Sequence, residues 1–308
     1  MAKEKVYVIG HKSPDTDTVC SAIAYAEYLK KKNKVDALAA ICGELNPETK
    51  YVLDLFKIEK PKKIDSAAGK ILVLVDHNEK TQMVEGADAA KIVEVLDHHK
   101  IVFECGSPIR FHTEPAGSTA TIAAKIMLAD KFKISKPLAG ILLSAILSDT
   151  VVFKSATTTE LDIKIAKILA KTAKISNLKK FGIEIKKQKA SLKGLNAAQV
   201  LRSDYKTFDS GGVKFGVGQI EVVELTEAKM RTAELLKEME ETAQNDSLNF
   251  VTLMATDIIN EGSLLLVAGD AAPIEKAFGK KYADGGIYIE KMMSRKKDFL
   301  PPVLKALG

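Results

Sequence analysis

The chain has 308 residues, of which 46% are hydrophobic and 28% are charged, values that are ordinary for a globular protein and argue against disorder. This length gives room for two domains with substantial cores. The net charge of +6 is spread along the sequence, which suits an anionic ligand but gives no indication of nucleic-acid binding.

The sequence shows neither a signal peptide nor an apolar run long enough to span a bilayer. Its three cysteines, Cys20, Cys42 and Cys105, lack the spacing of metal ligands. An odd number of cysteines in a chain without an export signal is typical of reduced thiols. We therefore expect a cytoplasmic protein that does not bind membranes.

The first half of the sequence alternates between strand and helix patterns. An apolar run at 6–9 leads into a polar loop, and apolar residues then recur at helical spacing from Val19 to Leu29. Further strands are predicted at 36–41, 71–75 and 92–96, and further helices at 47–56, 117–130, 138–147, 160–171 and 177–187. This order predicts an α/β domain built on a doubly wound, mainly parallel sheet.

The character of the sequence changes near residue 187, where a polar and basic segment begins. Beyond it, strands are predicted at 202–208, 213–222, 250–255, 263–268 and 286–290, and helices at 226–242 and 273–278. The first two of these strands are joined by a hairpin signal at 209–212. We therefore divide the chain into a first domain at 1–187, a linker that acts as a hinge at 188–194, and a smaller α+β domain at 195–308.

Polar residues that can bind metals gather where strands of the first domain are predicted to end. Four of the five histidines lie in Asp-containing segments at 11–17, 76–78 and 97–99, and Asp149 ends an apolar helix, whereas His112 lies outside these motifs. In parallel α/β sheets, ligands bind beyond the carboxyl ends of the strands. Imidazole and carboxylate donors suit Mn²⁺, Co²⁺, Zn²⁺ or Fe²⁺, and two neighbouring cations can activate water and hold a phosphoryl group.

Each segment taken alone also has a plainer interpretation. Asp17 or Thr18 can cap the helix that follows the first loop. His77 can pack beneath the loop, and Asn78 can either contact a substrate or only shape its turn. Residues 117–119 can bind an anion through backbone N–H groups or simply allow close helix packing.

Taken together, the motifs resemble those of the DHH phosphoesterase superfamily. They are His11-x-x-x-Asp15-x-Asp17, Asp76-His77-Asn78, Asp97-His98-His99 and Leu147-Ser148-Asp149. The segment Ser294-Arg295-Lys296-Lys297, shortly before Pro301-Pro302, narrows the resemblance to the family II inorganic pyrophosphatases, which use manganese or cobalt. The resemblance spans the whole chain, and the length fits the compact form without an inserted regulatory domain.

This resemblance implies an enzyme that hydrolyses inorganic pyrophosphate to two orthophosphates. It implies two Mn²⁺ or Co²⁺ ions, the first held by His11 and Asp15, the second by Asp17, His98 and Asp149, and both by Asp76. A hydroxide held between these metals would attack one phosphorus, which makes Asp76 part of the catalytic machinery. Additional Mg²⁺ would arrive with the substrate.

The resemblance also implies which residues bind the substrate. His99 would bind a phosphate and protonate the leaving group, while Arg295 and Lys296 would bind the terminal phosphate. Lys206 matches the position of a substrate lysine, and Asn78 is a further candidate. Because these cationic groups and the metal ligands lie in different domains, catalysis would require domain closure over the substrate. A homodimer through the sheet edge of the first domain is implied as well.

Two other functions remain as alternatives. A related DHH phosphodiesterase would act on short oligonucleotides or cyclic dinucleotides, but such enzymes usually carry a glycine-rich motif in the second domain. The glycine pairs at 211–212 and 285–286 fall in a turn and at a strand start, and neither resembles that motif. A sensor on an inactive scaffold would lack some ligands, whereas all six are present. We therefore expect a manganese-dependent pyrophosphatase.

Overall fold

The computed structural model describes residues 4–190, 192–283 and 285–308. The chain divides into two compact units, Met1–Lys189 and Ala190–Gly308. Helix α6 (Leu178–Ala190) continues into the segment at 188–194 that the sequence suggests as a linker. No helix within the described ranges has both the length and the apolar character that a bilayer crossing needs.

Six parallel strands form the sheet of the first unit, in the order β3-β2-β1-β4-β5-β6. They are β1 (Lys5–Ile9), β2 (Asp36–Ile41), β3 (Lys62–Lys63), β4 (Ile71–Val75), β5 (Lys91–Asp97) and β6 (Arg110–Thr113). The chain runs outward from β1 to β3 and then returns to β4 on the other side of β1. This arrangement confirms the parallel α/β sheet, and β1 and β4 form the switch point at which such sheets bind ligands.

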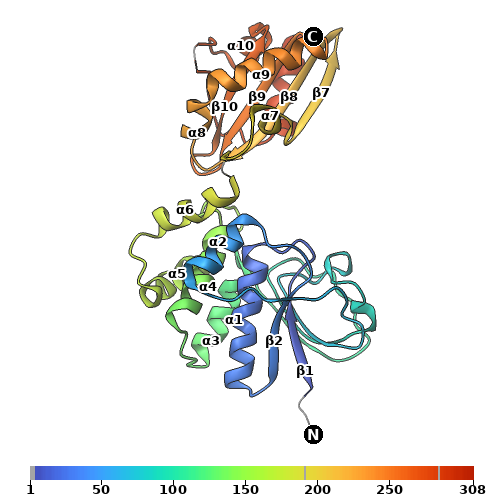
Figure 1. The fold of residues 1–308 in the computed structure, drawn as a ribbon, viewed down its shortest axis with the longest axis vertical. Helices are drawn as coiled ribbons and strands as arrows, with labels where there is room; N and C mark the ends of the chain where they lie inside the picture. Colours follow the sequence, from blue (N-terminus) through green and yellow to red (C-terminus); the bar gives the residue numbers. More distant parts are fainter. Residues whose placement is uncertain (1–3, 191, 284) are drawn as a thin grey trace. The chain divides into compact units, whose positions relative to one another are not determined.

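Helices cover one face of this sheet. They are α1 (Thr16–Lys32), α2 (Pro47–Phe56), α3 (Thr119–Ala129), α4 (Lys136–Asp149) and α5 (Glu160–Ala173). Helix α1 packs on β1, β2 and β4, and α4 contacts α1, α2, α3 and α5 (Figure 1). The central position of α4 follows from its sequence, because a helix that is apolar all round must be buried and its residues 138–147 are all buried.

Apolar residues from the connection between β4 and β5 also pack against the sheet. Leu72 and Leu74 of β4 belong to a cluster with Met83, Val84 and Ala87. These last three residues lie in or beside two 3₁₀ turns, η1 (Lys80–Gln82) and η2 (Ala87–Ala89). The connection between β4 and β5 therefore begins with polar residues but contributes apolar side chains to the core further on.

The second unit contains a five-stranded sheet in the order β11-β10-β9-β8-β7. Its strands are β7 (Tyr205–Ser210), β8 (Val213–Val222), β9 (Phe250–Asp257), β10 (Gly262–Gly269) and β11 (Ile287–Glu290). Strands β8 and β9 pair in parallel, and the other neighbours are antiparallel. One core cluster packs the sheet against α7 (Ala197–Arg202), α8 (Thr226–Met230) and α9 (Thr232–Asn245). A second cluster includes α10 (Ala272–Phe278) and α11 (Leu300–Leu307). The predicted mixed α+β unit is thus confirmed.

Candidate metal centre

Three neighbouring strands and two helices deliver the candidate ligands to one place. Strands β1, β4 and β5 lie side by side, and His11, Asp76 and His98 follow their carboxyl ends. Helix α1 has Asp15 as its N-cap, and α4 ends at Asp149. The sheet order therefore brings together residues that are far apart in the sequence, as the strand-end argument predicts.

The first group of potential ligands contains His11, Asp15 and Asp76. The imidazole Nε2 of His11 lies 3.7 Å from Asp15 Oδ2 and 3.6 Å from Asp76 Oδ2. These separations are longer than those of ordinary hydrogen bonds. The side chain of Asp76 is buried, and those of His11 and Asp15 are partly exposed, so the group is reachable from solvent on one side.

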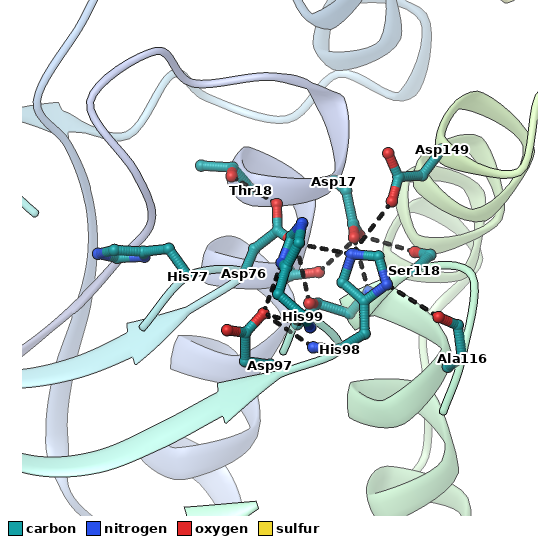
Figure 2. A network of polar contacts seen from close by, with 12 residues as sticks. Asp17, Thr18, Asp76, His77, Asp97, His98, His99, Ala116, Ser118 and Asp149 are labelled. Atoms are coloured by element: carbon teal, nitrogen blue, oxygen red, sulfur yellow. Dashed lines mark hydrogen bonds and ion pairs between the residues drawn. The ribbon is translucent and has the colours of Figure 1, made fainter. Parts of the chain in front are cut away.

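The second group contains Asp17, His98 and Asp149. His98 Nε2 lies 3.3 Å from Asp149 Oδ2 and 3.4 Å from Asp76 Oδ1. Figure 2 shows the imidazole of His98 between these side chains, with His99 beside it. A third group combines Asp76, His98 and His99. Asp76 therefore lies next to the histidines of the first and second groups, His11 and His98, one through each carboxylate oxygen.

Asp76 is held in an unusual backbone conformation. Its φ angle is +63°, in the left-handed region where Asp and Asn are tolerated better than most residues. Its carboxylate is 2% exposed and accepts hydrogen bonds from Thr18 Oγ1 at 2.6 Å and from Thr119 Oγ1 at 2.9 Å. The two hydroxyls fix the carboxylate plane, and neither threonine was assigned this role from the sequence.

Asp17 lies at the N-terminus of α3 rather than capping its own helix. Its carboxylate accepts hydrogen bonds from the backbone N–H groups of Thr119 at 2.6 Å and Ala120 at 2.9 Å, and from Ser118 Oγ at 2.8 Å. The helix start at 117–119 thus binds an anion, as its sequence allows, and the anion is the protein's own carboxylate. The cap of α1 is Asp15, which accepts from Thr18 N–H at 2.9 Å.

The fit of these residues to a metal ion can be judged from His98. Its Nδ1 lies 2.9 Å from the carbonyl oxygen of Ala116, a contact that directs Nε2 toward the carboxylates. Buried Nε2 has no hydrogen-bond partner among the described residues. An imidazole nitrogen and several carboxylate oxygens that converge without shared hydrogen bonds suit a divalent transition metal, so the residues fit a manganese site.

The histidines and aspartates of this cluster shift one another's pKa values. Burial, followed by Asp76, raises the pKa of Asp149 to about 7 and raises the pKa of Asp17 well above its usual range. Burial disfavours charged His11 and His98, but the adjacent carboxylates outweigh it and raise the pKa of each to about 10. Burial also opposes charge on Asp76, yet these two imidazoles hold its pKa well below the usual range. Divalent cations relieve such crowding of carboxylates.

His99 is oriented by Asp97 and remains half exposed. Its Nδ1 lies 2.8 Å from Asp97 Oδ1, and its side chain is 53% exposed. Asp97 raises the pKa of His99, with burial opposing it. Asp97 is itself buried and also accepts from the backbone N–H groups of His98 and His99. It therefore positions both histidines, a role that the sequence does not identify.

Asn78 and His77 are turned into the protein. The Asn78 amide donates to Asp97 Oδ2 at 2.6 Å and to the Lys100 carbonyl, and it accepts from Val102 N–H. These contacts show that Asn78 shapes the turn, so its contact with a substrate stays a prediction. His77 Nδ1 lies 2.9 Å from the Val75 carbonyl oxygen, and burial lowers its pKa. His77 belongs to none of the ligand groups found among the described residues.

Three candidate phosphate-binding residues lie in the second unit. Lys206 and Lys296 are exposed, but Arg295 is buried. Its Nη1 donates to the carbonyl oxygens of Asp204 at 2.6 Å and Val217 at 3.1 Å, and its Nη2 donates to Asp204 Oδ1 at 2.7 Å. The structure thus brings Arg295 next to the start of β7, where Lys206 lies. It also gives Arg295 a structural role that the sequence does not reveal.

The fold and the carboxylate–histidine cluster define a two-domain protein of the DHH type. The model of the DHH family N-terminal domain matches residues 5–146, and that of the DHHA2 domain matches residues 183–306. The chain is 45% identical over 307 residues to the manganese-dependent inorganic pyrophosphatase of Methanothrix thermoacetophila, covering 98% of each chain. It is 38% identical to that of Bacillus subtilis, covering 99% of each. The chain therefore belongs to the family of manganese-dependent inorganic pyrophosphatases.

A solved structure agrees with this assignment. A crystal structure of a Methanococcus jannaschii protein, assigned to the family II inorganic pyrophosphatases, matches with a TM-score of 0.64 and 40% identity. The match covers 98% of this chain and 99% of that one. Fold, family models and relatives together confirm the resemblance drawn from the sequence motifs.

Proposed function

We propose that this protein is a manganese-dependent enzyme that hydrolyses inorganic pyrophosphate to two orthophosphates. The observation that carries the proposal is the pair of ligand groups joined by Asp76 at the carboxyl ends of β1, β4 and β5. Relatives named for this activity align over almost the full length of the chain, and this supports the same chemistry here.

The proposed ligands divide between two cations. One would be held by His11 and Asp15, the other by Asp17, His98 and Asp149, and both by Asp76. Bound Mn²⁺, or Co²⁺ in its place, would supply Lewis-acid activation of water and neutralise phosphate charge. The carboxylates set the positions of the cations, and the imidazoles favour a transition metal over Mg²⁺, which we propose enters with the substrate.

His99 is the proposed acid of the reaction. Because Nδ1 faces Asp97, the other ring nitrogen of this half-exposed side chain is available to a phosphate oxygen. Asp97 holds the ring and stabilises its charged form, so that the imidazole can donate a proton to the departing orthophosphate. Lys206, Arg295 and Lys296 are the phosphate-binding groups that we propose for the second unit, and Asn78 remains a further candidate for substrate contact.

Two further properties belong to the proposal. We infer a cytoplasmic location, which the free thiols of Cys20, Cys42 and Cys105 support. We also infer a homodimer, because β6 forms one edge of the first sheet and an edge strand offers unpaired backbone groups to a second copy.

The decisive test is an assay of substrate preference. Protein purified without metal and then supplied with Mn²⁺ should release orthophosphate from pyrophosphate. It should scarcely cleave p-nitrophenyl phosphate, short oligonucleotides or cyclic dinucleotides. Preferred cleavage of a dinucleotide would instead identify a DHH phosphodiesterase, and binding without turnover of any of these compounds would indicate a sensor.

A further inference from the structure

Glu48 is a buried carboxylate that joins four helices outside the ligand groups. It lies in the first turn of α2 and is 2% exposed. Its Oε1 accepts hydrogen bonds from Thr16 Oγ1 at 2.7 Å and from Ser148 Oγ, and its Oε2 lies 3.3 Å from Lys186 Nζ. These partners belong to α1, α4 and α6. A carboxylate in such a place is tolerated only because it is paired and hydrogen-bonded.

Both hydroxyls that bind Glu48 belong to neighbours of the proposed metal ligands. Thr16 lies between two of these ligands in the sequence, and Ser148 directly precedes a third. Lys186 contacts the same turn of α4, because its Nζ lies 3.4 Å from the Ser148 carbonyl oxygen and 3.5 Å from its Oγ. A shift of Glu48 or Lys186 would therefore move backbone that carries ligands.

The chain that follows Asp149 needs such support. Val151, Val152 and Phe153 have φ angles of +48°, +55° and +66°, a left-handed turn that is costly for β-branched and aromatic residues. Helix α6 packs tightly on this turn, since a Cβ atom placed on Gly182 would lie 2.9 Å from Val152 Cγ2. Helix α6 thus holds both sides of Asp149, one through Lys186 and the other through Gly182.

We propose that Glu48 and Lys186 are positioning residues for the metal centre. Acting through Thr16 and Ser148, they fix the first turn of α1 and the last turn of α4, and thereby set the affinity for the cation that Asp149 helps to hold. This inference rests on the proposed metal centre. Lys186 lies three residues before Lys189, the last residue of the first unit.

The test compares Lys186→Met with Tyr51→Phe. Tyr51 OH donates to Glu184 Oε1 and so links the same helices, α2 and α6, at an exposed position away from the ligands. Metal-free protein is titrated with Mn²⁺, free Mn²⁺ is followed by electron paramagnetic resonance, and circular dichroism confirms the fold. Lys186→Met should weaken one of two Mn²⁺ affinities about ten-fold, the scale of supporting residues in metal sites. Tyr51→Phe should leave both unchanged, and Lys186→Arg should largely restore binding.

A second variant keeps the test decisive if Lys186→Met fails to fold. Ser148→Ala removes the hydroxyl that bonds to Glu48 and Lys186 next to Asp149, but it leaves the Glu48–Lys186 ion pair intact. We expect it to weaken the same Mn²⁺ affinity about three-fold, on the scale of a lost hydrogen bond. Wild-type affinities in a folded Lys186→Met protein, or in Ser148→Ala if Lys186→Met does not fold, would overturn the inference and leave the proposed function standing. Absence of Mn²⁺ binding by the wild-type protein would instead refute the proposed metal centre.

Discussion

Replacing Asp76 with asparagine should disable both cation sites at once. Asp76 lies 3.6 Å from His11 Nε2 through one oxygen and 3.4 Å from His98 Nε2 through the other. Asparagine is the most conservative change, because it also tolerates the left-handed backbone of this position. It can still accept a hydrogen bond from Thr18 or Thr119. The substitution therefore removes charge while it preserves shape.

The expected loss can be worked from these distances. The Asp76–imidazole separations give the length scale of the interaction. At an effective dielectric constant near 20, a carboxylate stabilises a unit positive charge roughly 3.5 Å away by about 5 kcal/mol. Asparagine recovers part of this gain, because its amide oxygen is still a possible ligand. We therefore expect each Mn²⁺ affinity to fall at least about 100-fold, which corresponds to about 2.7 kcal/mol.

Isothermal titration of metal-free protein with Mn²⁺ measures this effect directly. Wild-type protein should bind two Mn²⁺ ions. Asp15→Asn and Asp149→Asn, which each alter one group, should retain one tight site, and Asp76→Asn should retain none. Pyrophosphate hydrolysis should be lost in Asp76→Asn with an unchanged circular dichroism spectrum. If folded Asp76→Asn still bound one Mn²⁺ at wild-type affinity, Asp76 would not be shared between the sites.

Three further outcomes follow from the structure. Mn²⁺ at about 100 times its Kd should stabilise the fold by about 2.7 kcal/mol per site. Excess chelator should therefore lower the melting temperature, and an unchanged melting temperature would count against a buried metal centre. Arg295→Ala should lower the free energy of unfolding by roughly 2–4 kcal/mol, because it removes the guanidinium donors of the buried Val217 carbonyl oxygen and of Asp204. Lys296→Ala should leave stability unchanged in the same urea titration. Exposed Cys105 should react rapidly with a thiol reagent, whereas Cys20 should react only after unfolding. Burial raises the pKa of the Cys20 thiol and keeps it protonated. Rapid labelling of both cysteines would contradict the buried position of Cys20.

The sequence predicts the parallel sheet well because its strands and helices are long and regularly patterned. Apolar runs at 71–75 and 92–96 mark two central strands, and their polar ends mark the site. Strands β3 and β6 are not predicted, because they have only two and four residues and their pairing depends on neighbours far away in the sequence. Helix α11 is missed for another reason: its two prolines indicate a break, but they occupy the first turn, where proline is accepted.

The sequence indicates which candidate ligands gather at one place, but not the contacts that support them. The positions of His and Asp at strand ends identify the candidate ligands without any coordinates. Whether Asn78 faces a substrate or its own turn, and whether Arg295 has free donors or bonds to Asp204, depends on side-chain partners far apart in sequence. Glu48 gives no signal at all, because a single acidic residue in the first turn of a helix is most simply interpreted as favouring the helix dipole.

Capping a helix and binding a metal are compatible roles for the aspartates of the first loop. Among the described residues, Asp17 Oδ1 accepts three hydrogen bonds, whereas Oδ2 accepts only that of Thr119 N–H. A carboxylate oxygen has two lone pairs, so Oδ2 keeps one for a cation. Asp15 divides its oxygens in the same way, with Oδ1 on Thr18 N–H and Oδ2 toward His11. Helix starts therefore orient these carboxylates and leave one oxygen of each available, as the proposed assignment of the two aspartates to different cations requires.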